Sequence, residues 1–157
     1  MRESQRIADQ LRRAMEGESW HGPSVLEVLA GLDAKLAAAR PLAAAHSIWE
    51  IVGHIRVWNE TVVRRLHGEV VELSPAEDWP MISKTSDTDW EDEVRALKLA
   101  HAKAYNAFYA LPDSRLLETA PGKPAFHNFY YEMHGLVQHD LYHAGQIAVL
   151  KKALGEF

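Results

Sequence analysis

Two histidines four residues apart, His139 and His143, are the side chains of this sequence whose spacing best suits a metal ion. On an α-helix, residues i and i+4 lie one above the other on a single face. A third imidazole, His54, lies in another segment with helical apolar spacing, which can pack antiparallel to the first. Three neutral ligands leave a position open for water or substrate. The pair therefore predicts half of a metal site that His54 would complete.

Spacing alone is weak evidence for ligation, because nine histidines in 157 residues give roughly 0.5 such pairs by chance. The surroundings of the pair carry more weight. On a helical wheel, His139 and His143 share a face that otherwise supplies core positions, so the pair is expected to point inward. The wheel places His54 at the edge of its own buried stripe, where a side chain can face a cleft. The other members of the shared face are Glu132, Leu136, Gln146 and Leu150.

Several polar residues near these histidines have competing interpretations. Asp140 lies 100° around the helix from His139 and so cannot easily bind the same ion; it could orient a ligand on a neighbouring helix, but we expect it to be solvated. Glu50 could act as a general base, but its place in a capping box already explains it. Gln146 would position a bound water or substrate, or bond a backbone group. The remaining histidines share no register and are expected at the surface or at helix caps: His21, His46, His67, His101, His127 and His134.

The composition of the chain limits the kinds of metal site and partner that it can have. The chain has no cysteine, which excludes disulfides, thiolate catalysis and thiolate zinc sites, so any metal must be held by nitrogen and oxygen. A net charge of −5 with interleaved signs argues against nucleic-acid binding. The amino terminus lacks a secretory apolar run, and no stretch approaches the roughly 18 apolar residues of a membrane span. We therefore expect a cytoplasmic protein without membrane partners, and residues 1–157 as a single domain.

Apolar residues recur at helical spacing in four long segments, and none shows the alternation of a strand, which predicts an all-α domain. The first helix is expected over 3–16, followed by one or two short helices with a break near Gly31. The second long helix is expected from Ser47, which forms a capping box with Glu50, to about Leu66. The wheel gives it a buried stripe of Ile51, Ile55, Trp58 and Val62.

Residues 68–87 predict a long connection that either carries function or crosses the end of a bundle. Thr88 and Glu91 suggest a second capping box for a helix that Pro112 ends. The last helix is expected from about Ala125 to Leu154, roughly 45 Å long. We expect aromatic residues to be core or interface material: Trp20, Trp49, Trp58, Tyr130, Tyr131 and Tyr142. This pattern is typical of a four-helix bundle with ligands reaching across its interior.

Three segments of the chain, 20–24, 46–55 and 138–147, resemble the DinB superfamily, which includes YfiT-like metal-dependent hydrolases. The resemblance covers nearly the whole sequence. It implies a bacterial four-helix bundle of up-down-down-up order, often a homodimer, with one divalent metal bound by three histidines. Matched by position, those ligands are His54, His139 and His143. Relatives include S-transferases and isomerases that use low-molecular-weight bacterial thiols, so the resemblance also implies such a thiol as a candidate cofactor.

Our leading hypothesis is a metal-dependent enzyme acting on a small molecule. His54, His139 and His143 would hold zinc or nickel, with iron or manganese as alternatives, and the ion would activate water or a thiol for hydrolysis or S-transfer. The alternative is a non-catalytic metal-binding or stress-response protein, in which Glu132 or Glu50 would close the site as a fourth ligand. A di-iron bundle is disfavoured, because it expects Glu-x-x-His on two helices, and this chain lacks such a pair.

Overall fold

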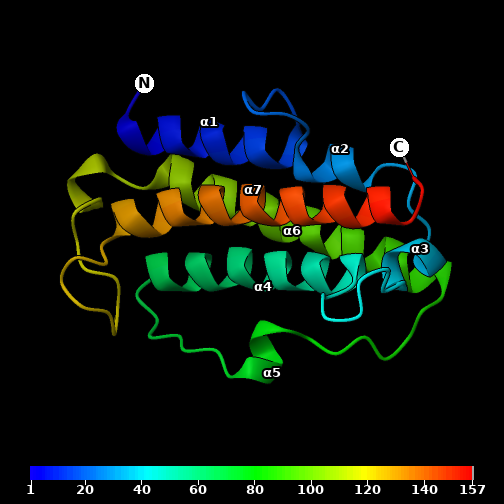
Figure 1. Ribbon diagram of the computed structural model, residues 1–157. Helices are drawn as coiled ribbons and strands as arrows, with labels where there is room; N and C mark the ends of the chain where they lie inside the picture. Colours follow the sequence, from blue (N-terminus) through cyan, green and yellow to red (C-terminus); the bar gives the residue numbers. More distant parts are fainter. Residues whose placement is uncertain (157) are drawn as a thin grey trace.

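The structure is a computed structural model that describes residues 1–156, and it is built around four long helices. These are α1 (Glu3–Glu16), α4 (Ile48–Leu66), α6 (Asp87–Ala110) and α7 (Phe129–Ala153), which lie side by side in Figure 1. The short elements are α2 (Val25–Leu29), α3 (Ala34–Ala38), α5 (Pro75–Asp78) and a 3-10 turn, η1 (Asp113–Arg115). Residues 1–156 contain no β-strand, which confirms the all-α prediction.

The bundle has the predicted up-down-down-up order. In Figure 1, α1 and α7 run in one direction, whereas α4 and α6 run in the other. Helices α1 and α4 each pack against both α6 and α7, so they occupy opposite corners of the bundle. The neighbouring helices α4 and α7 are therefore antiparallel, as the sequence analysis required for a site shared between them. No helix of residues 1–156 is long and apolar enough to span a membrane.

Two apolar clusters form the core, and a layer of polar side chains lies between them. One cluster joins α2 and α3 to the first half of α4 and the end of α7. The other joins α1 to the end of α4, the end of α6 and the start of α7. Where α4 crosses from one cluster to the other, and where α7 does the same, the buried side chains are polar: His54, Asn59, Asp140 and His143. The buried polar side chains of α4 and α7 therefore lie near the middle of the bundle's length.

Helix caps explain where the site-bearing helices begin. The predicted capping box of α4 is confirmed: Glu50 N donates to Ser47 Oγ at 3.2 Å, and Ser47 N donates to Glu50 Oε2 at 2.7 Å. Such a cap contributes about 1 kcal/mol to stability. The box predicted at Thr88 and Glu91 was two residues late, because α6 is capped by Ser86, whose hydroxyl oxygen accepts from the backbone of Asp89.

The start of α7 also differs from the prediction. The helix begins at Phe129 rather than near Ala125, because Asn128 Oδ1 accepts from Tyr131 N at 3.0 Å and so caps it. Asn128 is fixed in turn by an isolated antiparallel bridge to Thr119. The spacing of apolar residues along the sequence cannot predict this bridge, because the loop before α7 brings its two residues together.

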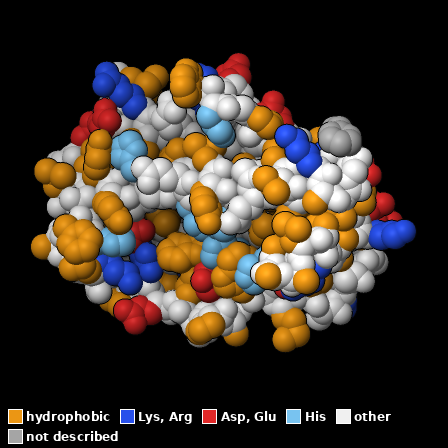
Figure 2. Space-filling model, in the orientation of Figure 1, with side chains coloured by type: hydrophobic (Ala, Val, Ile, Leu, Met, Phe, Trp, Pro, Cys, Tyr) orange, Lys and Arg blue, Asp and Glu red, His pale blue; other side chains and the backbone are white. Residues whose placement is uncertain are grey.

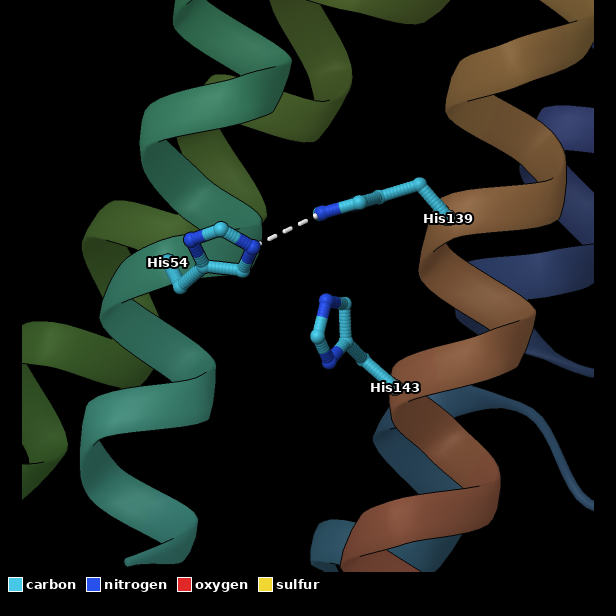
Figure 3. A group of neighbouring side chains, drawn as sticks. All are labelled: His54, His139 and His143. Atoms are coloured by element: carbon cyan, nitrogen blue, oxygen red, sulfur yellow. Dashed lines mark hydrogen bonds between the residues drawn. The ribbon is translucent and has the colours of Figure 1, made fainter. Parts of the chain in front are cut away.

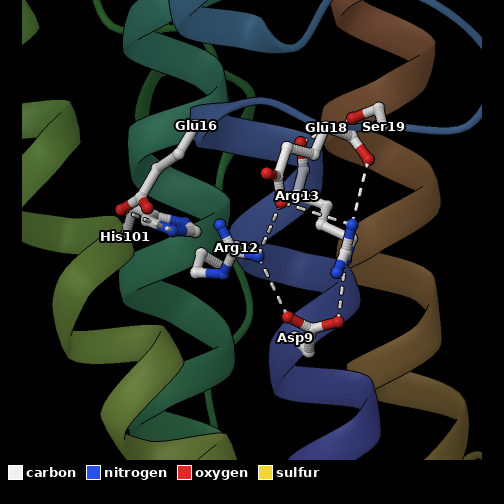
Figure 4. A network of polar contacts seen from close by, with 7 residues as sticks. All are labelled: Asp9, Arg12, Arg13, Glu16, Glu18, Ser19 and His101. Carbon is white, nitrogen blue, oxygen red and sulfur yellow. Dashed lines mark hydrogen bonds and ion pairs between the residues drawn. The ribbon is translucent and has the colours of Figure 1, made fainter.

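Some surface assignments were wrong. His101, expected at the surface, is buried on α6 beside Glu16 of α1, with His101 Nε2 4.0 Å from Glu16 Oε1. Figure 4 shows the neighbouring polar network on α1, in which Asp9 accepts from Arg12 and Arg13. Trp20, Tyr130, Tyr131 and Tyr142, expected in the core or an interface, are exposed and therefore not core, so an interface role stays a prediction for them. Trp49 is buried against Trp90 with ring centroids 5.2 Å apart, as expected of a core residue.

Candidate metal centre

The three predicted histidines meet between α4 and α7. His54 comes from α4, and His139 and His143 come from successive turns of α7. One nitrogen of each ring lies within 4.8 Å of one nitrogen of the other two, which is close enough for one ion to be held by all three. Figure 3 shows the rings converging on the space between the two helices. The antiparallel packing of α4 and α7 thus brings together residues 85 positions apart in sequence.

Burial keeps these imidazoles in the neutral form that binds metal. His54 and His143 are only 6% and 4% exposed. Loss of hydration lowers the pKa of His54 and lowers the pKa of His139 and of His143 to about 4, with the neighbouring histidine also lowering that of His143. The ordinary histidine pKa predicts metal loss as pH falls through about 6. The lowered pKa values move the pH at which protons compete with a metal ion to below about 6.

The outer nitrogens of two rings are fixed by acceptors, which sets their tautomers. His54 Nδ1 donates to the backbone carbonyl of Asp78 at 2.8 Å and lies 3.0 Å from its carboxylate. His143 Nδ1 donates to Gln146 Oε1 at 2.7 Å. Because each Nδ1 carries the proton, each Nε2 has a free lone pair. Gln146 therefore orients His143 rather than bonding a backbone group, the other role considered for it.

His139 completes the cluster but lacks an outer partner. Its Nε2 lies 3.0 Å from His54 Nε2, and its Nδ1 is buried without a hydrogen bond among the described residues. Two imidazole nitrogens face each other here, a contact that only one shared proton can satisfy. Two prearranged lone pairs and the Nε2 of a third ring facing the same space together fit a divalent cation held by nitrogen.

The connection between α4 and α6 covers this cluster, and sequence reasoning missed its part. Trp79 stacks on His54 with centroids 3.9 Å apart, and on its other face it stacks on His46 at 3.6 Å. Trp58 Nε1 donates to Asp78 Oδ1 at 2.7 Å, which fixes the carboxylate beside His54. The available signal was the Ser74–Glu77 capping box, which marks a helical turn, α5, that ends at Asp78.

Asp140 was expected to be solvated, and that expectation was wrong. Its side chain is completely buried between α7 and α4, where Asn59 Nδ2 donates to both carboxyl oxygens at 3.3 and 3.4 Å. Burial raises the pKa of Asp140 to about 8. Asp140 Oδ1 also lies 3.6 Å from His139 Nδ1, too far for a hydrogen bond. The carboxyl therefore belongs to the polar layer behind the histidines.

The two carboxylates considered as a fourth ligand are engaged elsewhere. Glu50 caps α4 and forms an ion pair with Arg40. Glu132 is buried in an ion pair with Arg65, with Glu132 Oε1 2.9 Å from Arg65 Nη1, and it also contacts His127. Neither belongs to the group of potential ligands found in residues 1–156, which consists of the three histidines.

A cavity opens on each side of the cluster. The larger one, which we call the wide groove, has a volume of about 590 Å3 and reaches His143, Gln146 and Trp79. The smaller one, about 260 Å3, reaches His139 and Trp58. Figure 2 shows histidine side chains along the middle of this face, flanked by apolar side chains. The remaining lining of the wide groove is mostly apolar and includes Leu42, Ile51, Tyr142, Val149 and Leu150.

Fold and site together define an up-down-down-up bundle with a histidine triad shared between two antiparallel helices. A family model described as the DinB superfamily matches residues 19–147, and the chain belongs to that superfamily. Among solved structures, it is similar to a crystal structure titled as the conserved protein of a locus from Enterococcus faecalis. The two share 13% identity and a TM-score of 0.75 over 99% of each chain, which supports the common fold. No curated protein matches the sequence.

Proposed function

We propose that this protein is a metal-dependent enzyme in which His54, His139 and His143 hold one divalent ion. The observation that carries the proposal is the convergence of three nitrogens within 4.8 Å in a cluster that burial keeps neutral. Zinc or nickel suits an all-imidazole donor set best, with iron and manganese as alternatives. When bound, the ion supplies a Lewis acid that lowers the pKa of a water or thiol.

The surrounding residues have distinct roles in this proposal. Asp78 and Gln146 orient His54 and His143 through their Nδ1 atoms, at 2.8 and 2.7 Å. Trp58 and Trp79 cover the rings and exclude bulk water from that side. The wide groove then delivers a small-molecule substrate to the His143 side, where the site has space. Its apolar walls suit the carbon skeleton of a substrate more than a charged group.

Two reaction types fit these residues. Hydrolysis requires an activated water, and S-transfer requires a thiol that enters as a second reactant, since the chain has no cysteine of its own. One cavity reaches His143 and the other reaches His139, and access from two sides favours a reaction with two reactants, which supports the S-transferase alternative. Assays with ester substrates and with bacillithiol, mycothiol or glutathione plus an electrophile separate the two.

The rival proposal is a non-catalytic metal-binding or stress-response protein. A closed structural site would need a fourth protein ligand. Both carboxylates suggested for that role, Glu50 and Glu132, have other partners. This arrangement favours an open coordination position and therefore the enzyme. An ion whose coordination sphere contained no exchangeable water would favour the rival.

The decisive experiment is elemental analysis of protein purified without a metal-affinity tag. We expect one divalent ion per chain in the natural sequence and its loss in His54→Ala and in His143→Ala. His67→Ala, which removes an exposed histidine at the end of α4, is the matched control and should retain the ion. Metal retained in His54→Ala, or absent from the natural protein after remetallation, would overturn the proposal. Homodimer formation through the long helices stays a prediction, which sedimentation analysis tests.

A further inference from the structure

We propose that the smaller cavity, which we call the Arg65 pocket, is a binding site for the anionic group of a small carboxylate. Its volume is about 260 Å3. Arg65 and Trp58 of α4 form one wall, and Glu132 and His139 of α7 form the other. Lys123 and His127, from the loop before α7, line it as well. The pocket therefore has a cationic region at the end away from the triad and a triad histidine at the other.

Arg65 has an incomplete set of hydrogen bonds for a buried guanidinium. Its side chain is 5% exposed. Nη1 donates to Glu132 Oε1 and Nη2 donates to the Val71 carbonyl, each at 2.9 Å, but the buried Nε has no partner. Arg65 lines the pocket, but its Nε has almost no exposed surface, so this atom is sealed from the cavity. The guanidinium therefore acts on the pocket through its positive charge, which an anion bound there would meet.

The charges around the pocket favour an anion. Arg65 and Lys123 contribute two positive charges, and Glu132 is the one carboxylate in its lining. Glu132 is shared between Arg65 and His127, whose Nε2 lies 2.8 Å from Glu132 Oε1. Lys123 has only a loose partner, the exposed Glu72, at 3.9 Å. Figure 2 shows basic side chains grouped where α4 ends. Among the residues that line the pocket, two positive charges therefore face one carboxylate, and the second positive charge is held by its exposed partner only loosely.

The size and lining of the pocket set the rest of the ligand. A space of about 260 Å3 is below the range of drug-sized ligand sites, so it suits an acid of a few carbon atoms. Val62 and Leu136 supply apolar contact for that chain, and Trp58 reaches from Arg65 to His139, with Arg65 Cζ 5.5 Å from its ring centroid. A carboxylate held at Arg65 and Lys123 would therefore extend its carbon chain toward the triad.

This inference deepens the proposed function by naming a substrate class, a small carboxylate whose far end reacts at the triad. Turnover of such a substrate rests on the proposed function, whereas binding in the Arg65 pocket does not. The test is therefore made on metal-free and metal-loaded protein in parallel. Butyrate is titrated at constant ionic strength and followed by NMR chemical-shift changes, with butyramide as the neutral compound of the same shape.

We expect butyrate to bind both forms of the protein and to shift the Trp58 indole signal. Butyramide should bind at least tenfold more weakly, because it lacks the charge. Equal affinity for the two compounds would overturn the proposal. Binding of butyrate to the loaded form alone would also overturn it, since the carboxylate would then be a metal ligand only. Butyrate bound to a protein without metal affinity would retain the Arg65 pocket while refuting the metalloenzyme.

Variants locate the binding to this pocket. Lys123→Gln should weaken butyrate about threefold, as expected for loss of one partly exposed charge. Arg65→Lys keeps the charge for Glu132 but should weaken butyrate about tenfold, since an ammonium cannot reproduce the guanidinium fork. Lys98→Gln, in a separate groove beside α6, is the matched control and should bind as the natural protein does. Lys123→Gln indistinguishable from Lys98→Gln would refute the assignment, even if Arg65→Lys failed to fold.

Discussion

Replacing Glu132 with glutamine should strongly destabilise the protein, because it removes one of the two charges of a buried ion pair and leaves the other. The Arg65 and Glu132 side chains are 5% and 4% exposed, and their charged atoms meet at 2.9 Å. Glu132→Gln preserves the size of the side chain but leaves the guanidinium buried without a counter-charge. Removing one partner of such a pair costs about 3 kcal/mol or more. For a chain of 157 residues, that loss corresponds to a fall in Tm of roughly 6–12 °C.

Thermal and urea unfolding followed by circular dichroism at 222 nm measure the effect. Removing both charges, in Arg65→Met with Glu132→Leu, should restore stability to within about 1 kcal/mol of the natural protein, because neither charge is then left buried alone. Arg64→Met is the matched control. Arg64 pairs with Glu69 at the surface, where both side chains are about half exposed, and such a pair contributes at most about 1 kcal/mol.

The double variant separates the effect of an uncompensated charge from the effect of altered packing. If Glu132→Gln lost no more stability than Arg64→Met, the pair between α4 and α7 would be hydrated in solution, contrary to the burial described above. If the double variant were as unstable as Glu132→Gln, the loss would come from packing at these positions and not from an uncompensated charge.

Three further predictions concern titratable groups around the site and core. His101 has a pKa near 6.5 in the unfolded chain, whereas burial lowers its pKa to about 4 in the folded protein. The metal-free protein therefore loses stability as pH falls from about 6.5 to 4. In urea titrations, His101→Leu should reduce the loss of stability between pH 6.5 and pH 5 by about 2 kcal/mol. Asp78→Asn keeps the backbone carbonyl that accepts from His54 Nδ1 but removes the negative charge 3.0 Å from that nitrogen, so metal binding should weaken, by up to about tenfold, in a competition with a chromophoric chelator. Affinity within twofold of the natural protein would contradict this. Burial raises the pKa of Asp140 to about 8, so the natural protein loses stability as pH rises from about 4 through 8. Asp140→Asn has no such titration, so its free energy of unfolding should rise relative to that of the natural protein by at least ~1 kcal/mol between pH 5 and pH 8. A difference in free energy of unfolding that did not change with pH would refute the raised pKa.

The long helices and the triad were accessible from sequence because their signals are local or periodic. The Ser47–Glu50 box, the pair on α7 and the inward face that carries it all depend on residues within a few turns of one another. His54 required one further assumption, that α4 and α7 are antiparallel neighbours. The bundle order implied by the DinB resemblance supplied it.

What sequence could not indicate depends on contacts between distant segments. Asp140 is buried because Asn59 of α4 meets it, and helical spacing contains no information about that partner. His101 lies four residues after Leu97 and three before Ala104, so its helical spacing already indicated a buried position, whereas its contact with Glu16 of α1 could not be read from that spacing. Asp78 ends a single helical turn and Trp79 follows it, in a connection whose path over the bundle is set by tertiary packing.

That connection divides the site into two parts with different tolerance for change. The three histidines belong to helices whose positions the whole core depends on, whereas much of their cover comes from a segment joined to the bundle only at its ends and through a few side chains. Apart from Asp78 and Trp79, which contact His54, insertions or substitutions between α4 and α6 can therefore alter what reaches the triad without disturbing the triad itself. In such an arrangement, selectivity for new molecules can diversify while the reactive centre is preserved, so two proteins of this fold need not share a substrate even where they share the histidines.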